Sequence, residues 1–183
     1  DVSKEHEVAD MLSKLRLTDV TGSGVHGISG IIHSAGVLRS ASAGSREVWT
    51  SKAQSAFWLH KHSQGDDVAL FVCFSSIAAA LGNIGQSSYA SANRYLEELV
   101  LHRNEASVRD GCVCRSASIQ WPAIRGVGMA AAVATAGEMD IDGVDLSIDD
   151  FASVFRSVVL GCLVSGGVSG GVSASATTTV MPV

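Results

Sequence analysis

The stretch that decides the fold is "DVALFVCFSS", residues 67–76. Its centre is an unbroken run of apolar residues, and two serines end it. A short continuous apolar run of this kind is typical of a strand that is covered on both faces of a parallel sheet. We therefore expect a buried strand here, with Ser76 at its carboxyl end.

Strand-like and helical patterns alternate on either side of this run. Further strands are expected within "GVHGISGIIHSAG" (24–36) and "GCVCRSASIQW" (111–121). Residues 46–62 and 87–104 show the spacing of helices. Strands that alternate with helices form parallel βαβ units, so the sequence predicts an α/β layered domain.

The two ends of the chain have different characters. The opening "DVSKEHEVADML" predicts a helix with Ser3 as its N-cap, and because it starts without methionine we expect the chain to be part of a longer polypeptide. Near the other end, Ser147 is the expected N-cap of a helix over 147–163. Residues 165–183 are rich in Gly, Ser and Thr, so we expect a domain over 1–164 and a flexible segment over 165–183 that leads into a last strand.

Composition limits the function classes. The 183 residues, 46% of them hydrophobic, suffice for one core. The net charge of -5 argues against a nucleic acid or an anionic membrane as partner, and no apolar run approaches the roughly 20 residues of a transmembrane helix. Cys112 and Cys114 alone are too few ligands for zinc, so no metal site is predicted. The sparse cysteines favour a reducing compartment, and we expect the cytoplasm.

Four polar groups on successive elements suggest chemistry. Tyr89 opens a helix thirteen residues after Ser76, Asn93 lies one helical turn further on, and Lys52 lies on the preceding helix. Hydride reduction of a carbonyl needs a proton donor at its oxygen, and a phenol of pKa about 10 needs a nearby cation to serve at neutral pH. Tyr89 as acid, Ser76 as a second donor and Lys52 as the cation meet that need, while Asn93 would hold water or the lysine head.

Each of these groups also has an ordinary structural explanation. A serine pair at a strand end commonly makes turn or cap contacts, a tyrosine at a helix start commonly packs with its hydroxyl at the surface, and single Lys or Asn residues are usually solvated. The same holds for three histidines. We expect His33 to be buried in a strand, and His60 and His62 to bind carbonyls at a helix end.

The longer motifs carry a family resemblance. From "GIIHSAGVL" through "VALFVCFSSIAAALGNIGQSSYASANRYLEELV" to "SIQWPAIRGVGMAA", the sequence resembles the ketoreductase domain of modular type I polyketide synthases, a branch of the short-chain dehydrogenase/reductases. The similarity covers roughly residues 1–160. In that family Asn follows Tyr by four positions and the lysine comes from the previous helix, as Asn93 and Lys52 do here.

The resemblance implies a fold, an activity and partners. The fold is a Rossmann-like doubly wound parallel sheet, N-terminally incomplete in this sequence. The activity is NADPH-dependent reduction of a β-ketoacyl thioester, held on an acyl carrier protein, to the β-hydroxyacyl product during polyketide biosynthesis. The catalytic residues are Lys52, Ser76, Tyr89 and Asn93, and the further partners are neighbouring synthase domains of the same chain.

The resemblance also implies positions for the cofactor. The residues expected beside NADPH are Asp1 and Val2 at the adenine, Ser34, Ala35 and Gly36 at the ribose, and Pro122 at the nicotinamide. Residues 123–143 are expected to form a lid. The glycine-rich fingerprint that cradles the pyrophosphate is absent from this sequence, so we expect the chain by itself to bind NADPH poorly and to be inactive.

Other departures leave two questions open. The sequence has Leu38, Arg39 and Ser40 where one stereochemical class carries Leu-Asp-Asp, and Leu81 where the other carries tryptophan, so the alcohol configuration is undecided. Two alternative functions also stand: a β-ketoacyl reductase of the fatty-acid synthase type, and an inactive structural domain. An assay that compares substituted with unsubstituted β-ketoacyl substrates would distinguish the fatty-acid type from the polyketide type. An NADPH titration that shows no binding would favour the inactive structural domain.

Overall fold

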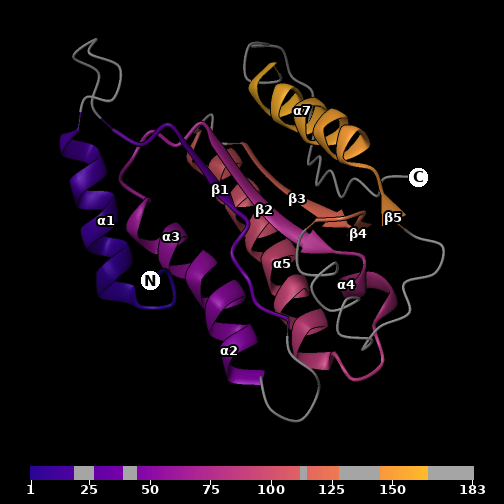
Figure 1. The fold of residues 1–183 in the computed structure, drawn as a ribbon. Helices are drawn as coiled ribbons and strands as arrows, with labels where there is room; N and C mark the ends of the chain where they lie inside the picture. The colour runs from indigo at the N-terminus through magenta and orange to yellow at the C-terminus, as the bar shows by residue number, and fades with distance from the viewer. Residues whose placement is uncertain (19–26, 39–44, 112–114, 128–144, 165–183) are drawn as a thin grey trace.

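A three-stranded parallel sheet forms the centre of the molecule (Figure 1). The computed structural model describes residues 1–18, 27–38, 45–111, 115–127 and 145–164. In the order of the sheet, the strands are β1 (Gly30–His33), β2 (Leu70–Ser76) and β3 (Arg115–Trp121), with β2 paired in parallel to both neighbours. The predicted α/β class and the predicted strand within 67–76 are confirmed, and this strand is the central one.

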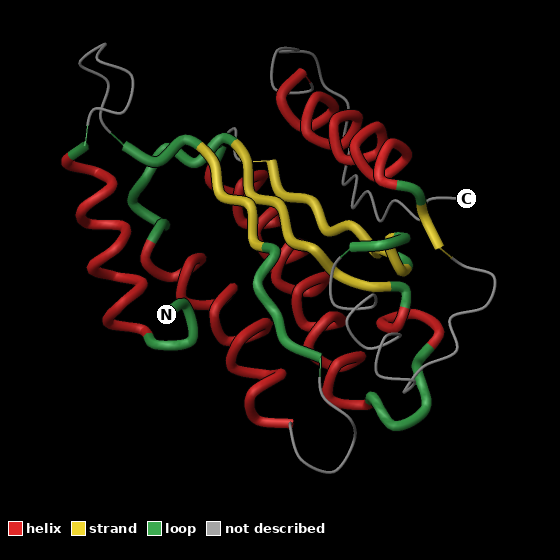
Figure 2. The backbone as a smooth tube through the Cα atoms, in the orientation of Figure 1, coloured by secondary structure: helices red, strands yellow, loops and turns green. Residues whose placement is uncertain are grey.

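Helices cover both faces of this sheet. On one face lie α1 (Glu5–Leu17), α3 (Ser55–His62) and α5 (Ser87–Asp110), and on the other lies α7 (Ile148–Val164), as Figures 1 and 2 show. Helix α5 packs on β2 and β3, α1 packs on α3, and α7 packs on β2 and β3 from the opposite side. This is the doubly wound, three-layer arrangement that the sequence predicted.

The side chains of β2 explain why its sequence is apolar throughout. Phe71 and Cys73 belong to the core shared with α1, α3 and α5, whereas Val72 and Phe74 pack with residues of α7. Successive side chains of a strand point to opposite faces, so a strand between two helical layers needs apolar residues at every position. Burial of each large apolar side chain contributes roughly 1.5–3 kcal/mol to stability.

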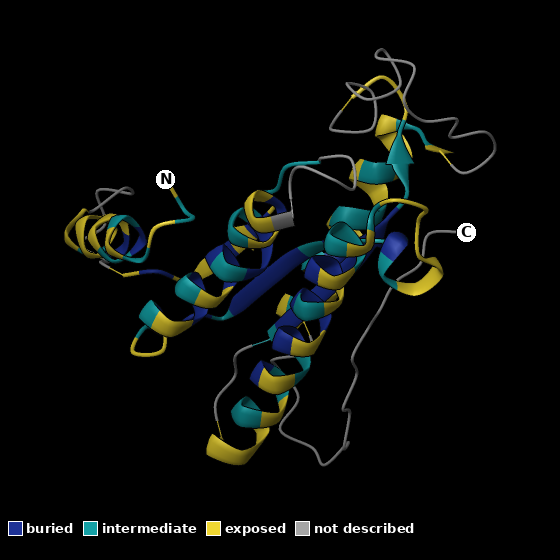
Figure 3. Cartoon of the chain, turned by 90° about the horizontal axis from the view of Figure 1, so that it is seen from below, coloured by how far each residue is buried: buried dark blue, intermediate teal, exposed yellow. Residues whose placement is uncertain are grey.

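Three helical segments differ from the sequence prediction. The expected helix over 46–62 is divided into α2 (Ser45–Trp49), a π-helical turn η1 (Thr50–Gln54) and α3. A short helix α4 (Ala78–Leu81) stands between β2 and α5. Helix α5 continues beyond 104 to Asp110 and is capped by Gly111, which has a left-handed φ of 68°. The buried stripe of α5 faces the sheet (Figure 3).

Of the two predicted N-caps, one is confirmed and one is wrong. The backbone N–H of Asp150 donates to Ser147 Oγ at 3.1 Å, as expected for a cap of α7. The N-cap of α1 is Lys4, without a side-chain cap bond. Ser3 is not the cap because its hydroxyl donates to Asp1 Oδ1 at 2.7 Å.

A second, two-stranded sheet lies beyond the end of β3. Strand β4 (Ala123–Ile124) pairs in parallel with β5 (Asp145–Leu146), and Arg125 Nε lies 2.6 Å from Asp145 Oδ2. Most of the expected lid (128–143) and the expected flexible segment with its last strand (165–183) fall outside the described residues, and the domain boundary at 164 stays a prediction. No helix in the described ranges has the length and apolarity to cross a membrane.

Candidate active site

Ser76 ends β2 and faces the short helix α4. Its Oγ accepts the backbone N–H of Ala78 at 3.2 Å, which is the turn contact expected of a serine at a strand end. A hydroxyl has one proton to donate and two lone pairs to accept with, so this contact leaves the Ser76 proton available. The structural and the chemical explanations of Ser76 are therefore compatible.

Tyr89 and Asn93 lie one turn apart at the start of α5. Asn93 is 0% exposed, and its Nδ2 donates to the backbone carbonyl of Tyr89 at 2.8 Å. Its Oδ1 is buried and meets no hydrogen-bond donor among the described residues. A buried carbonyl without a donor costs about 1–3 kcal/mol. Asn93 thus keeps an unused acceptor beside Tyr89, as a group that binds water or another amine does.

Lys52 reaches the same place from the π-helical turn. Its side chain is 2% exposed, its Nζ donates to the carbonyl oxygen of Phe74 at 2.9 Å, and the same Nζ lies 5.5 Å from the centroid of the Tyr89 ring. Burial lowers the pKa of Lys52 to about 8. The ammonium is therefore still charged at neutral pH, and it lies beside the tyrosine rather than in solvent.

Burial also acts on the tyrosine. Loss of water raises the pKa of Tyr89 above its usual value, while hydrogen bonding with Ser76 and Asn93 acts in the opposite direction. The phenol is consequently protonated at neutral pH, which is the state of a general acid. The four predicted catalytic side chains, from three segments of the chain, surround one point at the carboxyl edge of the sheet.

The small-residue turn after β1 lies against Lys52. A side chain at Gly36 would meet Lys52 Nζ at 3.5 Å, and of the preceding residues Ser34 is exposed and Ala35 half-buried. Figure 2 shows this turn as the loop that leaves the end of β1. Half-buried Pro122 follows Trp121, whose carbonyl accepts the N–H of Ile77 at 3.1 Å. These positions therefore share the carboxyl edge with the four polar groups.

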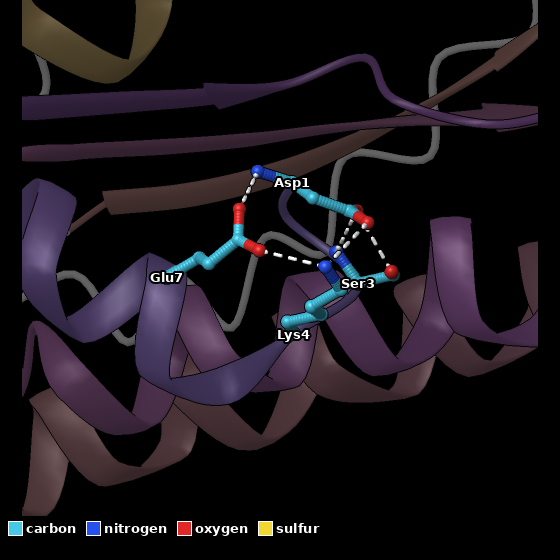
Figure 4. Close-up of polar contacts among 4 residues, drawn as sticks. All are labelled: Asp1, Ser3, Lys4 and Glu7. Atoms are coloured by element: carbon cyan, nitrogen blue, oxygen red, sulfur yellow. Dashed lines mark hydrogen bonds and ion pairs between the residues drawn. The ribbon is translucent and has the colours of Figure 1, made fainter.

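Asp1 and Val2 lie at the start of the chain, before α1. The carboxylate of Asp1 accepts the N–H and the hydroxyl of Ser3, with Lys4 and Glu7 close by (Figure 4). Val2 packs against the core that α1 shares with α3 and α5. None of these contacts reaches Lys52 or Tyr89, so the structure does not bring this pair directly to the four polar groups.

A buried carboxylate beneath the site was missed by the sequence analysis. Glu97 is 2% exposed, and its Oε1 accepts from Ser75 Oγ at 2.7 Å and from Gln120 Nε2 at 2.9 Å. Arg94 Nη1 contacts its other oxygen at 3.0 Å. The available signal was its position one turn after Asn93, on the stripe of α5 that faces the sheet. Glu97 fixes α5 to β2 and β3 immediately below the site.

The three histidines have partners that the sequence did not reveal. His33 is buried as predicted, and its Nε2 lies 2.9 Å from the carbonyl oxygen of Lys52. His60 and His62 were expected to bind backbone carbonyls at a helix end, and this prediction was wrong. His60 Nδ1 lies 2.7 Å from Arg103 Nη1, and His62 Nε2 lies 3.0 Å from Glu5 Oε1, because charged side chains from other helices come within reach.

Comparison with known proteins assigns the family. The model of the family described as "KR domain" matches residues 1–126. The chain belongs to the KR domain family. The spectinabilin polyketide synthase system protein NorB of Streptomyces orinoci is 31% identical to this KR chain over 144 residues, which are 75% of the chain and 6% of that protein. The chain spans 1–6% of the length of the curated relatives it matches first.

Solved structures agree with this family. A structure of A-type ketoreductases from a modular polyketide synthase is 25% identical, with a TM-score of 0.72, over 88% of this KR chain and 33% of that chain. A short-chain dehydrogenase/reductase from Mycobacterium ulcerans shares the fold at 21% identity, with a TM-score of 0.60, over 75% of this chain and 51% of that one. The Rossmann-like fold class that the sequence predicted is confirmed.

Proposed function

We propose that this KR chain reduces a β-ketoacyl thioester, carried by an acyl carrier protein, to the β-hydroxyacyl product with NADPH during polyketide biosynthesis. The observation that carries the proposal is the buried Lys52 ammonium 5.5 Å from the Tyr89 ring, in a member of the KR family. A buried cation beside a protonated phenol is the pair that carbonyl reduction requires at neutral pH.

Each polar group has a role in this reaction. Tyr89 Oη gives its proton to the carbonyl oxygen of the substrate, where negative charge develops. Lys52 stabilises the phenolate that remains, because its ammonium is desolvated and held by the Phe74 carbonyl. Ser76 offers its hydroxyl proton to the same substrate oxygen, and Asn93 Oδ1 orders the water or amine that returns a proton to Tyr89.

The residues at the sheet edge fit a nicotinamide cofactor. NADPH, when bound, supplies the hydride. Ser34, Ala35 and Gly36 would hold its ribose and Pro122 its nicotinamide, with Asp1 and Val2 at the adenine. Gly36 supports this assignment because its backbone lies next to Lys52, with a Cβ built at Gly36 only 3.5 Å from Lys52 Nζ.

Family membership also supports the choice of a thioester substrate and its carrier. The relatives are named as polyketide synthases, and they are much longer than this chain. We therefore propose that an acyl carrier protein delivers the substrate and that neighbouring synthase domains lie in the same polypeptide.

The proposal is tested with two tyrosine variants in the full natural polypeptide that contains this chain. Tyr89→Phe should lower the rate of NADPH oxidation with a β-ketoacyl thioester by about 10²–10⁴-fold, because the acid is lost. Tyr95→Phe is the matched control, since Tyr95 also lies on α5 but packs against Trp49. Near-normal turnover of Tyr89→Phe would overturn the assignment.

The wild-type protein tests the alternatives in the same assay. Turnover of substituted β-ketoacyl substrates supports the polyketide reductase, whereas turnover of unsubstituted ones alone points to the fatty-acid type. No turnover together with no NADPH binding would replace the proposed function with a structural role.

A further inference from the structure

His33 is a buried titratable residue that the proposed reaction does not use. It is the last residue of β1, is 2% exposed, and pairs in register with Cys73 of β2. A fully buried imidazole is uncommon unless its ring nitrogens are hydrogen-bonded, because loss of water from a polar group costs free energy.

The contact of His33 is with the backbone of Lys52. His33 Nε2 lies 2.9 Å from the Lys52 carbonyl oxygen, and a carbonyl only accepts, so Nε2 carries the proton and donates it. Ser55 Oγ lies 3.2 Å from the same nitrogen, donates to the carbonyl oxygen of Ser51 at 2.6 Å, and lies 3.1 Å from the carbonyl oxygen of Lys52. The imidazole is thus joined to the backbone that carries the ammonium.

This backbone is the π-helical turn η1. The N–H of Ser55 donates to the carbonyl of Thr50, five residues back, which is the pattern of a π-helix. A π turn contains one residue more than an α turn, and each residue of a helix rotates the next side chain by about 100°. The turn therefore decides which way Lys52 points, and a conversion to regular α-helix would change its direction.

We propose that His33 is a positioning residue: it holds the Lys52 carbonyl, keeps η1 in its π-helical form, and so keeps the Lys52 ammonium beside Tyr89. Its effect on turnover rests on the proposed function, whereas its effect on Lys52 does not. Burial lowers the pKa of His33 to about 4, with the Lys52 charge acting in the same direction, so the donor is a neutral imidazole at pH 7.

The test compares two replacements at residue 33 in the full natural polypeptide. His33→Gln keeps an N–H donor at a similar reach, and His33→Leu keeps the volume without a donor. His60→Leu is the matched control, because His60 is also a buried imidazole but contacts Arg103 and not η1. We expect His33→Leu to lower kcat about tenfold or more with KM within about twofold, and His33→Gln to restore kcat to within about threefold of wild type.

A second readout follows Lys52 directly. The ¹³Cε resonance of Lys52, titrated with pH and assigned with Lys52→Met, reports its ionisation without any turnover. In wild type it should titrate near pH 8, and in His33→Leu it should move toward 10.5, because a released ammonium gains water. His60→Leu should leave this titration unchanged.

The outcomes separate the two proposals. Equal kcat and equal Lys52 titration in wild type and His33→Leu would overturn the role of His33, as would a His33→Gln variant as impaired as His33→Leu. If His33→Leu does not fold, ¹⁵N spectra of the wild-type imidazole decide, because a proton on Nδ1 and not Nε2 contradicts the assigned bond. If the wild-type protein shows no turnover but the Lys52 pKa rises as expected in His33→Leu, the proposed function is contradicted and the role of His33 is supported.

Discussion

Lys52 shows at the scale of one residue how burial and charge are balanced. Its ammonium leaves water, which disfavours the charged form, and in return it meets the Phe74 carbonyl and the face of the Tyr89 ring. The result is a cation with a pKa of about 8, close to the pH at which it is needed. Such a perturbed group beside a half-buried phenol is the usual mark of a functional site.

This balance predicts how activity depends on pH. Lys52 is protonated below its pKa and loses its charge as pH rises through about 8, whereas the pKa of Tyr89 is raised and its phenol stays protonated in that range. Reductase activity should therefore fall with an apparent pKa near 8, measured as kcat against pH. In Lys52→Arg, whose side chain keeps its charge, the remaining activity should not fall near pH 8. A fall of kcat near pH 8 in that variant would show that Lys52 is not the group responsible.

Helix α5 carries the site because polar contacts fix its register on the sheet. Glu97 accepts from Ser75 of β2 and Gln120 of β3, and Asn104 exchanges two hydrogen bonds of 2.9 Å with the backbone of Ser116 at the start of β3. These contacts tie the middle and the second half of the helix to the sheet. The placement of Tyr89 and Asn93 over β2 follows from them.

Two replacements of Glu97 test this at the level of stability. Glu97→Leu should lower the free energy of unfolding by about 2–4 kcal/mol, because the Ser75 hydroxyl and the Gln120 amide lose their acceptor in the core. Glu97→Gln keeps an oxygen for both and should cost less than about 1 kcal/mol. Urea unfolding measures both, with the exposed neighbour Glu98→Gln as control, and a Glu97→Leu variant as stable as wild type would contradict the account.

At the level of elements, the strands and helices that have a regular pattern of apolar residues could be predicted from the sequence. The apolar run of 67–76 is typical of a buried strand and predicted β2, and the spacing of 87–104 predicted α5. The π turn at 50–54 was not predictable, because its sequence has the ordinary spacing of a helix and the His33 contact that we propose to maintain it comes from another segment. The partners of Glu97 and His60 were missed for the same reason: a hydrogen bond between distant segments leaves no periodic signal.

At the scale of the whole molecule, the three layers bury two imidazoles as well as the apolar core. Burial lowers the pKa of both His33 and His60 to about 4, below the value of 6.5 for a solvated imidazole. The unfolded chain therefore binds more protons than the folded one between these two values. The stability from the neutral imidazoles is complete above pH 6.5 and is lost as pH falls toward 4.

Acid should accordingly destabilise the fold in this window. For His33, which is 2% exposed, the difference in pKa between the folded and the unfolded chain corresponds to a loss of about 3 kcal/mol of unfolding free energy between pH 7 and pH 4. Urea unfolding of wild type and His33→Gln at pH 7.5 and 4.5 measures it, since the contribution of the carboxylates is common to both proteins. Equal losses in the two proteins would show that His33 does not titrate in this range.

The central claim is that the lysine and the tyrosine act as one unit in carbonyl reduction. A double-mutant cycle of Lys52→Met and Tyr89→Phe, followed by the rate of β-hydroxyacyl formation in the full natural polypeptide, tests it most directly. We expect the double variant to be about as slow as the slower single variant, because each change disables the same proton transfer. If the fold-loss in rate of the double variant equals the product of the two single losses, the two residues act independently and do not form one unit.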